Sequence, residues 1–170
     1  MTNLREQLQQ CIEERACFLA LGNIDYGDDG LGVRLGERML AAGVPDVVIA
    51  GTNPERCLGG LAGKRFDHVL FLDAVEFGVA PGSVVLLDAS AIEGRFPQIS
   101  THKISLATLS RWVEANGAKA WLLGVQPESL RPGRRLSETV EATLEALSAL
   151  LQSLRPLRST AGQPVAEVRV

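Results

Sequence analysis

Apolar and polar residues alternate along this chain in two periods, which together predict alternating helices and strands. In several stretches apolar residues recur at steps of three and four, the spacing that gives a helix one buried face. Between them lie short, almost continuously apolar runs, typical of strands covered on both faces of a parallel sheet. The predicted strands span residues 16–21, 46–50, 68–72, 83–87 and 118–123. The predicted helices begin after Asn3, near Leu31, near Pro54, after Ser105 and after Ser137.

Capping signals support several helix ends. Asn3 with Glu6 three residues later has the form of an N-terminal capping box. Gly43 is placed to end the second helix. The last helix must end before Pro156, because proline disfavours helical backbone in the residue that precedes it.

This order of elements predicts an α/β fold: a three-layer sandwich with a twisted, mostly parallel sheet of about five strands and helices on both faces. The connection 74–82 is too short for a crossover helix, so the fourth strand is expected to run antiparallel and to pair with the third. Residues 1–154 are predicted to form a single domain. Residues 155–170, rich in small and polar residues, are predicted to form a flexible tail.

Composition narrows the class of protein. The chain has 170 residues, a net charge of −3 and a pI near 5.4, which argues against nucleic acid as a partner. No apolar run is long enough to cross a bilayer, so we expect no membrane partner and a cytoplasmic monomer. Cys11, Cys17 and Cys57 match neither a zinc motif nor a disulfide framework, so we expect them to be small buried residues in a reducing compartment.

An acidic turn follows the first predicted strand. The segment from Gly22 to Gly32 is rich in glycine and leads into a helix, as a phosphate-binding loop would. Asp28 and Asp29, however, occupy the position of the phosphate, so the turn should repel anions and attract a cation. The alternative is that one aspartate caps the helix and the other lies in its first turn.

Two similar strand ends are distinguished by direction. Asp73 closes an apolar strand that is expected to be parallel to the first, which would place it at the same edge of the sheet as Asp29. Asp88 ends a similar Leu-Leu-Asp segment, but an antiparallel strand would deliver it to the opposite edge. Asp88 is therefore expected to form a turn.

The two histidines are distinguished in the same way. His68 begins a strand and should lie at the edge opposite Asp29, in a surface or packing role. His102 lies in a loop just before a helix, where a structural role is the alternative to a catalytic one. If His102 converged with Asp29 and Asp73, two oxygens and one nitrogen would suit a divalent metal such as nickel or zinc and leave open coordination positions.

The same segments resemble the successive motifs of the nickel–iron hydrogenase maturation proteases. Their order and approximate spacing agree from Cys17 to about Leu151. The segments Thr101-His102 and 124–127 are most similar to the branch that processes the hydrogenase 3 (formate hydrogenlyase-type) large subunit. The matching segments are Gly22-Asn23, Asp29-Gly30-x-Gly32, Ala50-Gly51-Thr52, Leu72 to Gly78 with Pro81-Gly82, Ser100-Thr101-His102 and Gly124-Val125-Gln126-Pro127.

The chain departs from many relatives at Ala20 and Ala50, where glycine, or at the second position an acidic residue, is common. Alanine is still small, so a close backbone approach is expected to survive. The helix before the first strand is an addition relative to shorter members.

The resemblance implies an endopeptidase that removes the C-terminal extension of a hydrogenase large-subunit precursor. Asp29, Asp73 and His102 are then the nickel-binding and catalytic residues, and nickel arrives in the substrate precursor. Whether an aspartate activates the attacking water or nickel acts as the Lewis acid is left open. The alternatives are a non-enzymatic α/β ligand-binding module and an inactive, chaperone-like relative.

Overall fold

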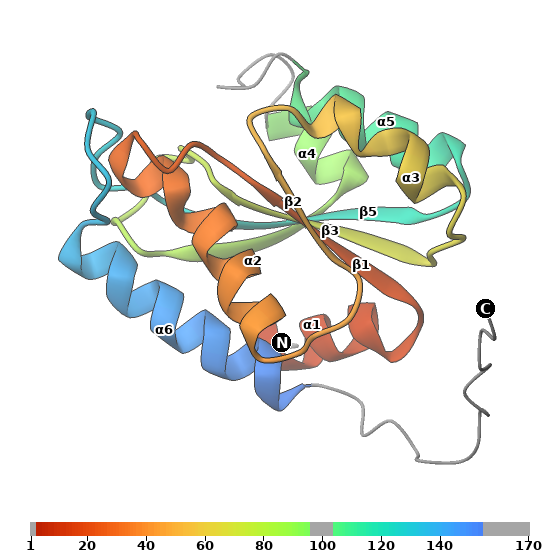
Figure 1. Ribbon diagram of the computed structural model, residues 1–170, viewed down its shortest axis with the longest axis horizontal. Coiled ribbons are helices and arrows are strands. Elements are labelled where there is room, and N and C mark those ends of the chain that lie inside the picture. Colours follow the sequence, from red (N-terminus) through yellow and green to blue (C-terminus); the bar gives the residue numbers. More distant parts are fainter. Residues whose placement is uncertain (1–2, 96–103, 155–170) are drawn as a thin grey trace, which may run out of the picture.

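The computed structural model describes residues 3–95 and 104–154. Five strands form one twisted sheet in the order β2-β1-β3-β5-β4 (Figure 1). The strands are β1 Ala16–Leu21, β2 Val47–Gly51, β3 His68–Ala74, β4 Val84–Asp88 and β5 Lys119–Val125. The helices are α1 Leu4–Glu13, α2 Leu31–Ala41, α3 Leu58–Ala62, α4 Ala89–Arg95, α5 Leu106–Ala115 and α6 Glu138–Ser153, with short 3₁₀ turns η1 Gly27–Gly30 and η2 Pro54–Arg56.

Helices cover both faces of the sheet and bury two apolar layers. Leu8 of α1, Leu35 of α2 and Leu144 of α6 pack on one face. Leu61 of α3 and Leu109 of α5, with Ile92 of α4, pack on the other (Figure 1). The predicted three-layer α/β architecture is confirmed. In the described part of the chain, no helix has the length and apolar character needed to cross a membrane.

The fourth strand runs in the predicted direction but has a different partner. β4 is antiparallel, and it pairs with β5 rather than with β3. β5 lies between them and is parallel to β3. The prediction of a β3–β4 pair was therefore wrong. The connection 75–83 does not need to form a hairpin, because it has only to cross two strand spacings, about 10 Å.

Most boundaries agree with the sequence pattern to within one or two residues. The capping box is present, since the Asn3 side chain accepts from the Glu6 amide and the Glu6 side chain accepts from the Asn3 amide. The helix expected from Pro54 to Leu61 is divided into η2 and α3. Helix α4 was not predicted, because Ile92 alone among its seven residues is buried and no apolar periodicity develops. The proposed tail, 155–170, lies outside the described residues.

Helix α2 packs unusually close to the sheet, and glycines allow it. A Cβ at Gly32 would lie 2.1 Å from the Leu72 carbonyl oxygen and 2.3 Å from that of Leu21. One turn later, a Cβ at Gly36 would lie 2.6 Å from the Cβ of Ala20. The start of α2 therefore rests directly on the carboxyl ends of β1 and β3. Alanine at position 20 fits because Gly36 opposes it.

Candidate active site

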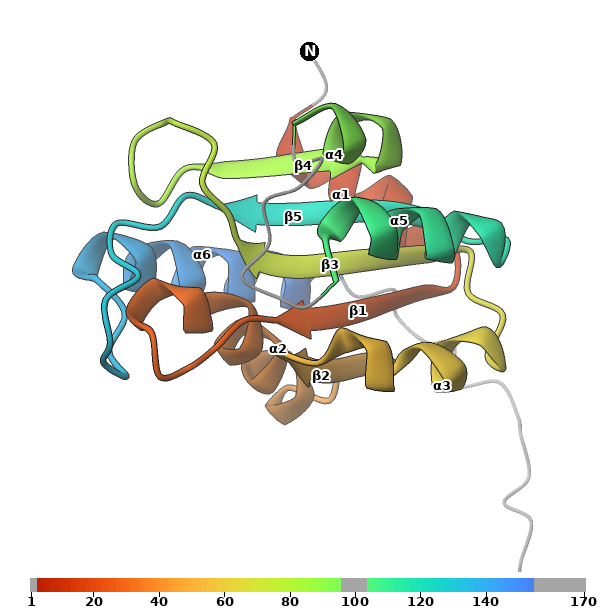
Figure 2. The same ribbon diagram turned by 90° about the horizontal axis from the view of Figure 1, so that it is seen from above.

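The two aspartates predicted for the site lie at the same edge of the sheet. Asp29 is in η1, after β1, and Asp73 is near the end of β3. Because β1 and β3 are neighbouring parallel strands, their carboxyl ends meet there, and Figure 2 shows the loops that follow β1, β3 and β5 together at this edge. Both side chains are buried, with 4% of Asp29 and 3% of Asp73 exposed. The strand-direction prediction holds for this pair.

Gly22 lies where the two segments meet. Its φ of +121° is in the region that favours glycine. A Cβ at this position would lie 1.9 Å from the Asp29 carbonyl oxygen and 3.8 Å from Oδ1 of Asp73. The amide of Asn23 donates to Oδ2 of Asp29 over 2.9 Å. The absence of a side chain at Gly22 thus lets η1 pack against the end of β1, where the Asp73 carboxylate also lies within van der Waals range.

This arrangement favours a cation as its ligand. Asp29 and Asp73 bring two buried acidic side chains to the same edge of the sheet. Carboxylate oxygens are common ligands of divalent cations. Two carboxylates would occupy only part of the ion's coordination sphere and leave positions for other donors. The described part of the site thus fits the two oxygen ligands of the predicted O, O, N set.

His102, the predicted third ligand, lies outside the described residues. Within residues 3–95 and 104–154, no three histidine, cysteine, aspartate or glutamate side chains are grouped closely enough to hold a metal ion. The complete ligand set of Asp29, Asp73 and His102 therefore stays a prediction.

Asp28, although adjacent to Asp29, has a different role. Its carboxylate is fully buried. It accepts from the amides of Glu128 at 2.8 Å, Ser129 at 2.9 Å and Ser137 at 2.7 Å, and from the Ser137 hydroxyl at 2.9 Å. These donors offset the cost of burying the charge. Asp28 thus fastens the loop between β5 and α6 to η1.

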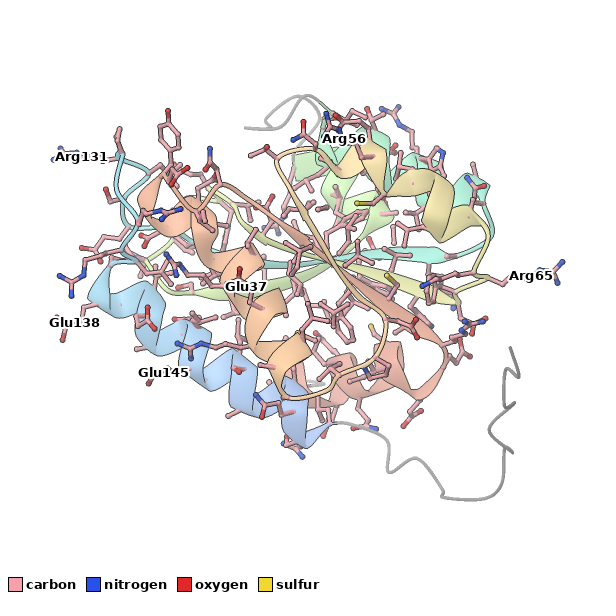
Figure 3. The ribbon with its side chains drawn as sticks, in the orientation of Figure 1. Glu37, Arg56, Arg65, Arg131, Glu138 and Glu145 are labelled. Atoms are coloured by element: carbon pink, nitrogen blue, oxygen red, sulfur yellow. The ribbon has the colours of Figure 1, made fainter. Side chains whose placement is uncertain are left out.

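Neither interpretation of the acidic turn anticipated this role for Asp28. The Asp28 carboxylate binds the loop between β5 and α6, and no side chain of the described residues caps α2. Backbone bonds reinforce the attachment: Gly27 donates to the Gly133 carbonyl and Gly133 donates to that of Asp25. Arg131, at the outer part of this loop, points away from the protein (Figure 3).

Gln126, which directly follows β5, holds the loop on the other side of Asp73. Its side-chain oxygen accepts from three successive amides, those of Phe77 at 2.9 Å, Gly78 at 3.1 Å and Val79 at 3.5 Å. The side chain is buried, with 6% of the residue exposed. Sequence reasoning noted Gln126 only as part of a family motif. A polar residue directly after a buried strand was the available signal for such a role.

The opposite edge of the sheet holds the two residues that strand direction excluded from the site. Asp88 is exposed. Its Oδ1 accepts from the Ala91 amide at 2.8 Å, and this hydrogen bond caps the start of α4. His68 is buried between two partners: its Nε2 lies 3.0 Å from Glu14 Oε2, and its Nδ1 accepts from the Trp121 indole at 2.9 Å. The packing role of His68 is confirmed, whereas Asp88, which was expected to form a turn, instead caps the start of α4.

Burial raises the pKa of all three cysteines and so disfavours their thiolate forms. Burial raises the pKa of Cys17 to about 12 and that of Cys11 to about 11. Cys57 is only partly buried, and burial, followed by the charge of Glu55, raises its pKa as well. At neutral pH thiols of this kind are neither metal-binding thiolates nor nucleophiles.

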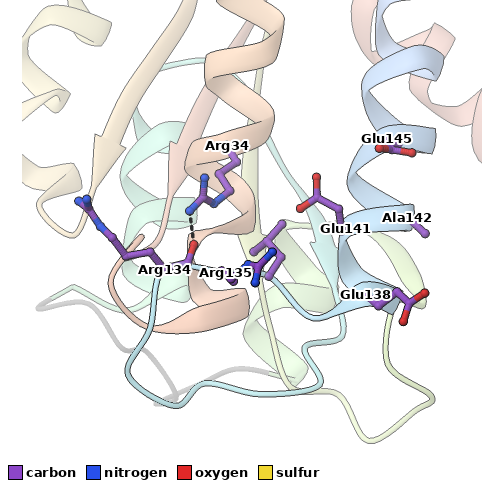
Figure 4. A pocket seen from close by; sticks show the side chains of 8 residues that line it. Arg34, Arg134, Arg135, Glu138, Glu141, Ala142 and Glu145 are labelled. Carbon is purple, nitrogen blue, oxygen red and sulfur yellow. Dashed lines mark hydrogen bonds between the residues drawn. The ribbon is translucent and has the colours of Figure 1, made fainter.

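A cavity of about 720 Å³ lies beside the site, between α2 and α6 (Figure 4). Arg34 enters it from α2 and donates to the Arg134 carbonyl oxygen. Neither Asp29 nor Asp73 lines this cavity, so it is separate from the carboxylate pair. Its lining residues are Arg34, Arg134, Arg135, Leu136, Glu138, Glu141, Ala142 and Glu145.

Comparison with known proteins decides the family. The family model described as hydrogenase maturation protease matches residues 31–153. The chain belongs to the hydrogenase maturation protease family. It is therefore a peptidase, as the resemblance in the sequence implied, and the non-enzymatic alternatives are not favoured.

Individual members of the family agree with this assignment. This maturation protease is 34% identical over 151 residues to the hydrogenase 2 maturation protease of Escherichia coli K12, covering 83% of this chain and 91% of the relative. It is 30% identical over 137 residues to the hydrogenase 3 maturation protease of the same organism, covering 75% and 87%. Proteins named for both hydrogenases are thus among its relatives.

Solved structures of the family share the fold. A [NiFe] hydrogenase maturation protease from Thermococcus kodakarensis superposes with a TM-score of 0.75 at 29% identity, covering 87% of this chain and 97% of that one. A hydrogenase 3 maturation protease superposes with a TM-score of 0.73 at 25% identity, covering 84% and 92%. The predicted family fold is confirmed.

Proposed function

We propose that this maturation protease removes the C-terminal extension of a nickel-loaded hydrogenase large-subunit precursor. Asp29, Asp73 and His102 bind the nickel that the substrate carries, and the scissile peptide is placed beside it. The observation that carries this proposal is that two buried aspartates, one in η1 and one near the end of β3, lie at the same edge of the sheet, where a Cβ on Gly22 would meet the Asp29 carbonyl oxygen and Oδ1 of Asp73. The protein acts as a cytoplasmic monomer and takes its metal from its substrate.

The chemistry follows from the character of the donors. Each carboxylate gives one hard, anionic oxygen to the ion, and an imidazole gives a borderline nitrogen, a combination that suits nickel. Binding through three protein groups leaves positions for the precursor's own ligands and for water. A nickel-free precursor would bring no cation for Asp29 and Asp73 to bind, so its binding would be weaker. Nickel would thus be a recognition element.

Two routes to hydrolysis fit this arrangement, and both use the same residues. In the first, an aspartate carboxylate accepts a proton from the water that attacks the scissile carbonyl. In the second, the substrate's nickel polarises that carbonyl, and the aspartates serve only to hold the ion. The dependence of cleavage rate on metal separates them, because replacing nickel by a cation of different Lewis acidity changes the rate strongly only in the second route.

The proposal is tested with purified precursor in two forms, nickel-loaded and nickel-free. Mass spectrometry should show loss of a C-terminal peptide from the nickel-loaded form alone. Cleavage of both forms would show that the reaction does not require nickel. Binding of the precursor without cleavage of either form would instead support a chaperone-like relative.

A further inference from the structure

The loop 76–81 combines exposure with a fixed shape. Glu76 and the segment 78–81 are exposed, and Val79 is 47% exposed although its side chain is apolar. The loop begins three residues after Asp73, at the edge of the sheet where the site lies (Figure 2). An exposed apolar loop gains little from being held rigid unless it contacts a partner, because ordering it costs conformational entropy.

Hydrogen bonds to a single residue, Gln126, hold this loop. Besides the three amides that its side-chain oxygen accepts, the Gln126 carbonyl accepts from Gly82 at 2.8 Å and its amide donates to Ser83 at 2.9 Å. Its side-chain nitrogen donates to the Pro127 carbonyl at 3.2 Å, which fixes the orientation of the amide group. Gln126 thus bonds both the outer turn and the end of the loop.

The base of the loop is also fixed. The Val75 amide donates to the Val125 carbonyl at 2.9 Å. The Thr143 hydroxyl of α6 donates to the Gly82 carbonyl at 2.8 Å. With both ends and the middle held, Val79 is an exposed side chain on a preformed turn, at the edge of the sheet where β3 ends (Figure 2). Preorganisation of this kind strengthens binding by reducing the entropy lost on association.

We propose that Gln126 is a positioning residue that holds loop 76–81 in the shape in which it contacts the client. Val79 is then an apolar contact for the precursor segment that flanks the bound nickel. This inference rests on the proposed function and specifies the surface that the client peptide touches. The loop follows β3 at the edge of the sheet that carries Asp29 and Asp73 and contains neither proposed nickel ligand, so it contributes to binding rather than to bond cleavage.

The contact is tested with a matched pair of surface substitutions, Val79→Ser and Leu40→Ser. Leu40 is 46% exposed, almost the same as Val79, but lies near the far end of α2. With nickel-loaded precursor, Val79→Ser should raise KM about tenfold with kcat nearly unchanged, the signature of lost ground-state binding. Leu40→Ser should leave both constants at the wild-type value. If the two variants had the same KM and kcat, the proposed contact at Val79 would be wrong.

The positioning role is tested by Gln126→Met and Gln126→Glu. Methionine keeps the approximate shape but removes the acceptor, so amide hydrogen exchange at residues 77–79 should accelerate and KM should rise about tenfold. Glutamate keeps an acceptor for the three amides and should recover part of both effects, although its second oxygen faces the Pro127 carbonyl. A merely structural role would lower the melting temperature of Gln126→Met without raising KM.

The outcomes separate this inference from the proposed function. If the wild-type protein does not cleave the nickel-loaded precursor, the proposed function fails, and this inference fails with it. If the wild type cleaves but neither Val79→Ser nor Gln126→Met changes KM, the inference alone is overturned. Accelerated exchange in Gln126→Met with an unchanged KM would also overturn it, because the loop's shape would then not matter to the client.

Discussion

The two edges of the sheet carry similar residues that have different roles. At the carboxyl edge of the parallel strands, Asp73 is buried beside Gly22 and η1. At the opposite edge, Asp88 is exposed and starts α4. Both aspartates end an apolar strand after leucine, so local sequence hardly separates them. Strand direction does, because it decides which edge the last residue reaches, and chemistry collects at the edge where parallel strands end.

The two edges also differ in the roles of their buried polar groups. His68, at the far edge, is satisfied on both nitrogens by Glu14 and Trp121. Those bonds stabilise the far edge. The same three residues, His68, Glu14 and Trp121, also line a cavity of about 570 Å³. At the near edge, Asp28 and Gln126 hold backbone loops, and two further carboxylates are brought together. The polar cluster at the far edge supports structure, whereas the two acidic side chains at the near edge are the ligands proposed for nickel.

The largest effect is expected at the near edge. Asp73→Asn and Asp29→Asn should each lower precursor cleavage at least about 100-fold, because each removes a charge proposed to bind the nickel. His102→Ala should do the same if it completes the set. Cleavage is followed by mass spectrometry, and circular dichroism should show that each variant is folded. If Asp73→Asn cleaved the precursor at the wild-type rate, the proposed functional difference between the two edges would be wrong.

The second effect tests the attachment of the β5–α6 loop. Asp28→Asn should reduce the free energy of unfolding by about 1–3 kcal/mol, because an amide nitrogen would face a backbone N–H or the Ser137 hydroxyl. Displacement of η1 should also slow cleavage. Thermal and urea unfolding measure the loss. Ser137→Ala is the control: it removes one donor, keeps the backbone amide, and should cost only about 1 kcal/mol. A larger loss in Ser137→Ala than in Asp28→Asn would contradict this account.

A third, smaller effect is expected at the far edge. His68→Ala should reduce stability by about 1–3 kcal/mol, because it leaves the Trp121 indole without its acceptor. The cleavage rate per folded molecule should stay at the wild-type value. Trp121→Phe, which removes the indole donor while keeping an aromatic ring, should be milder. A fall in kcat for His68→Ala in fully folded protein would place the histidine in the reaction.

The smallest effect is expected at Asp88. Asp88→Asn should change the free energy of unfolding by less than about 0.5 kcal/mol, since asparagine can still accept from the Ala91 amide. Cleavage should be unchanged. If Asp88→Asn damaged cleavage as much as Asp73→Asn, direction would not be what separates the two strand ends.

Sequence alone predicted the parallel part of the fold and the edge at which Asp29 and Asp73 lie, because strand polarity follows from connection length. It did not predict the partner of β4, since direction fixes which way a strand runs but not which neighbour it pairs with. The roles of Asp28 and Gln126 were missed because they depend on loops that come from distant parts of the chain. A buried carboxylate held by amides 100 residues away leaves no local pattern in the sequence.

The position of β5 between β3 and β4 has a consequence for how the chain is made. During synthesis β4 emerges before β5, yet its place in the sheet does not exist until β5 has joined β3. Until residues 119–125 arrive, β3 presents an open edge, and the Val-Val-Leu-Leu run of β4 has no native partner. Such unpaired apolar strands are where nascent chains associate with one another. Completion of the sheet thus waits for the last strand, and the interval before it is when this protein is most vulnerable to aggregation.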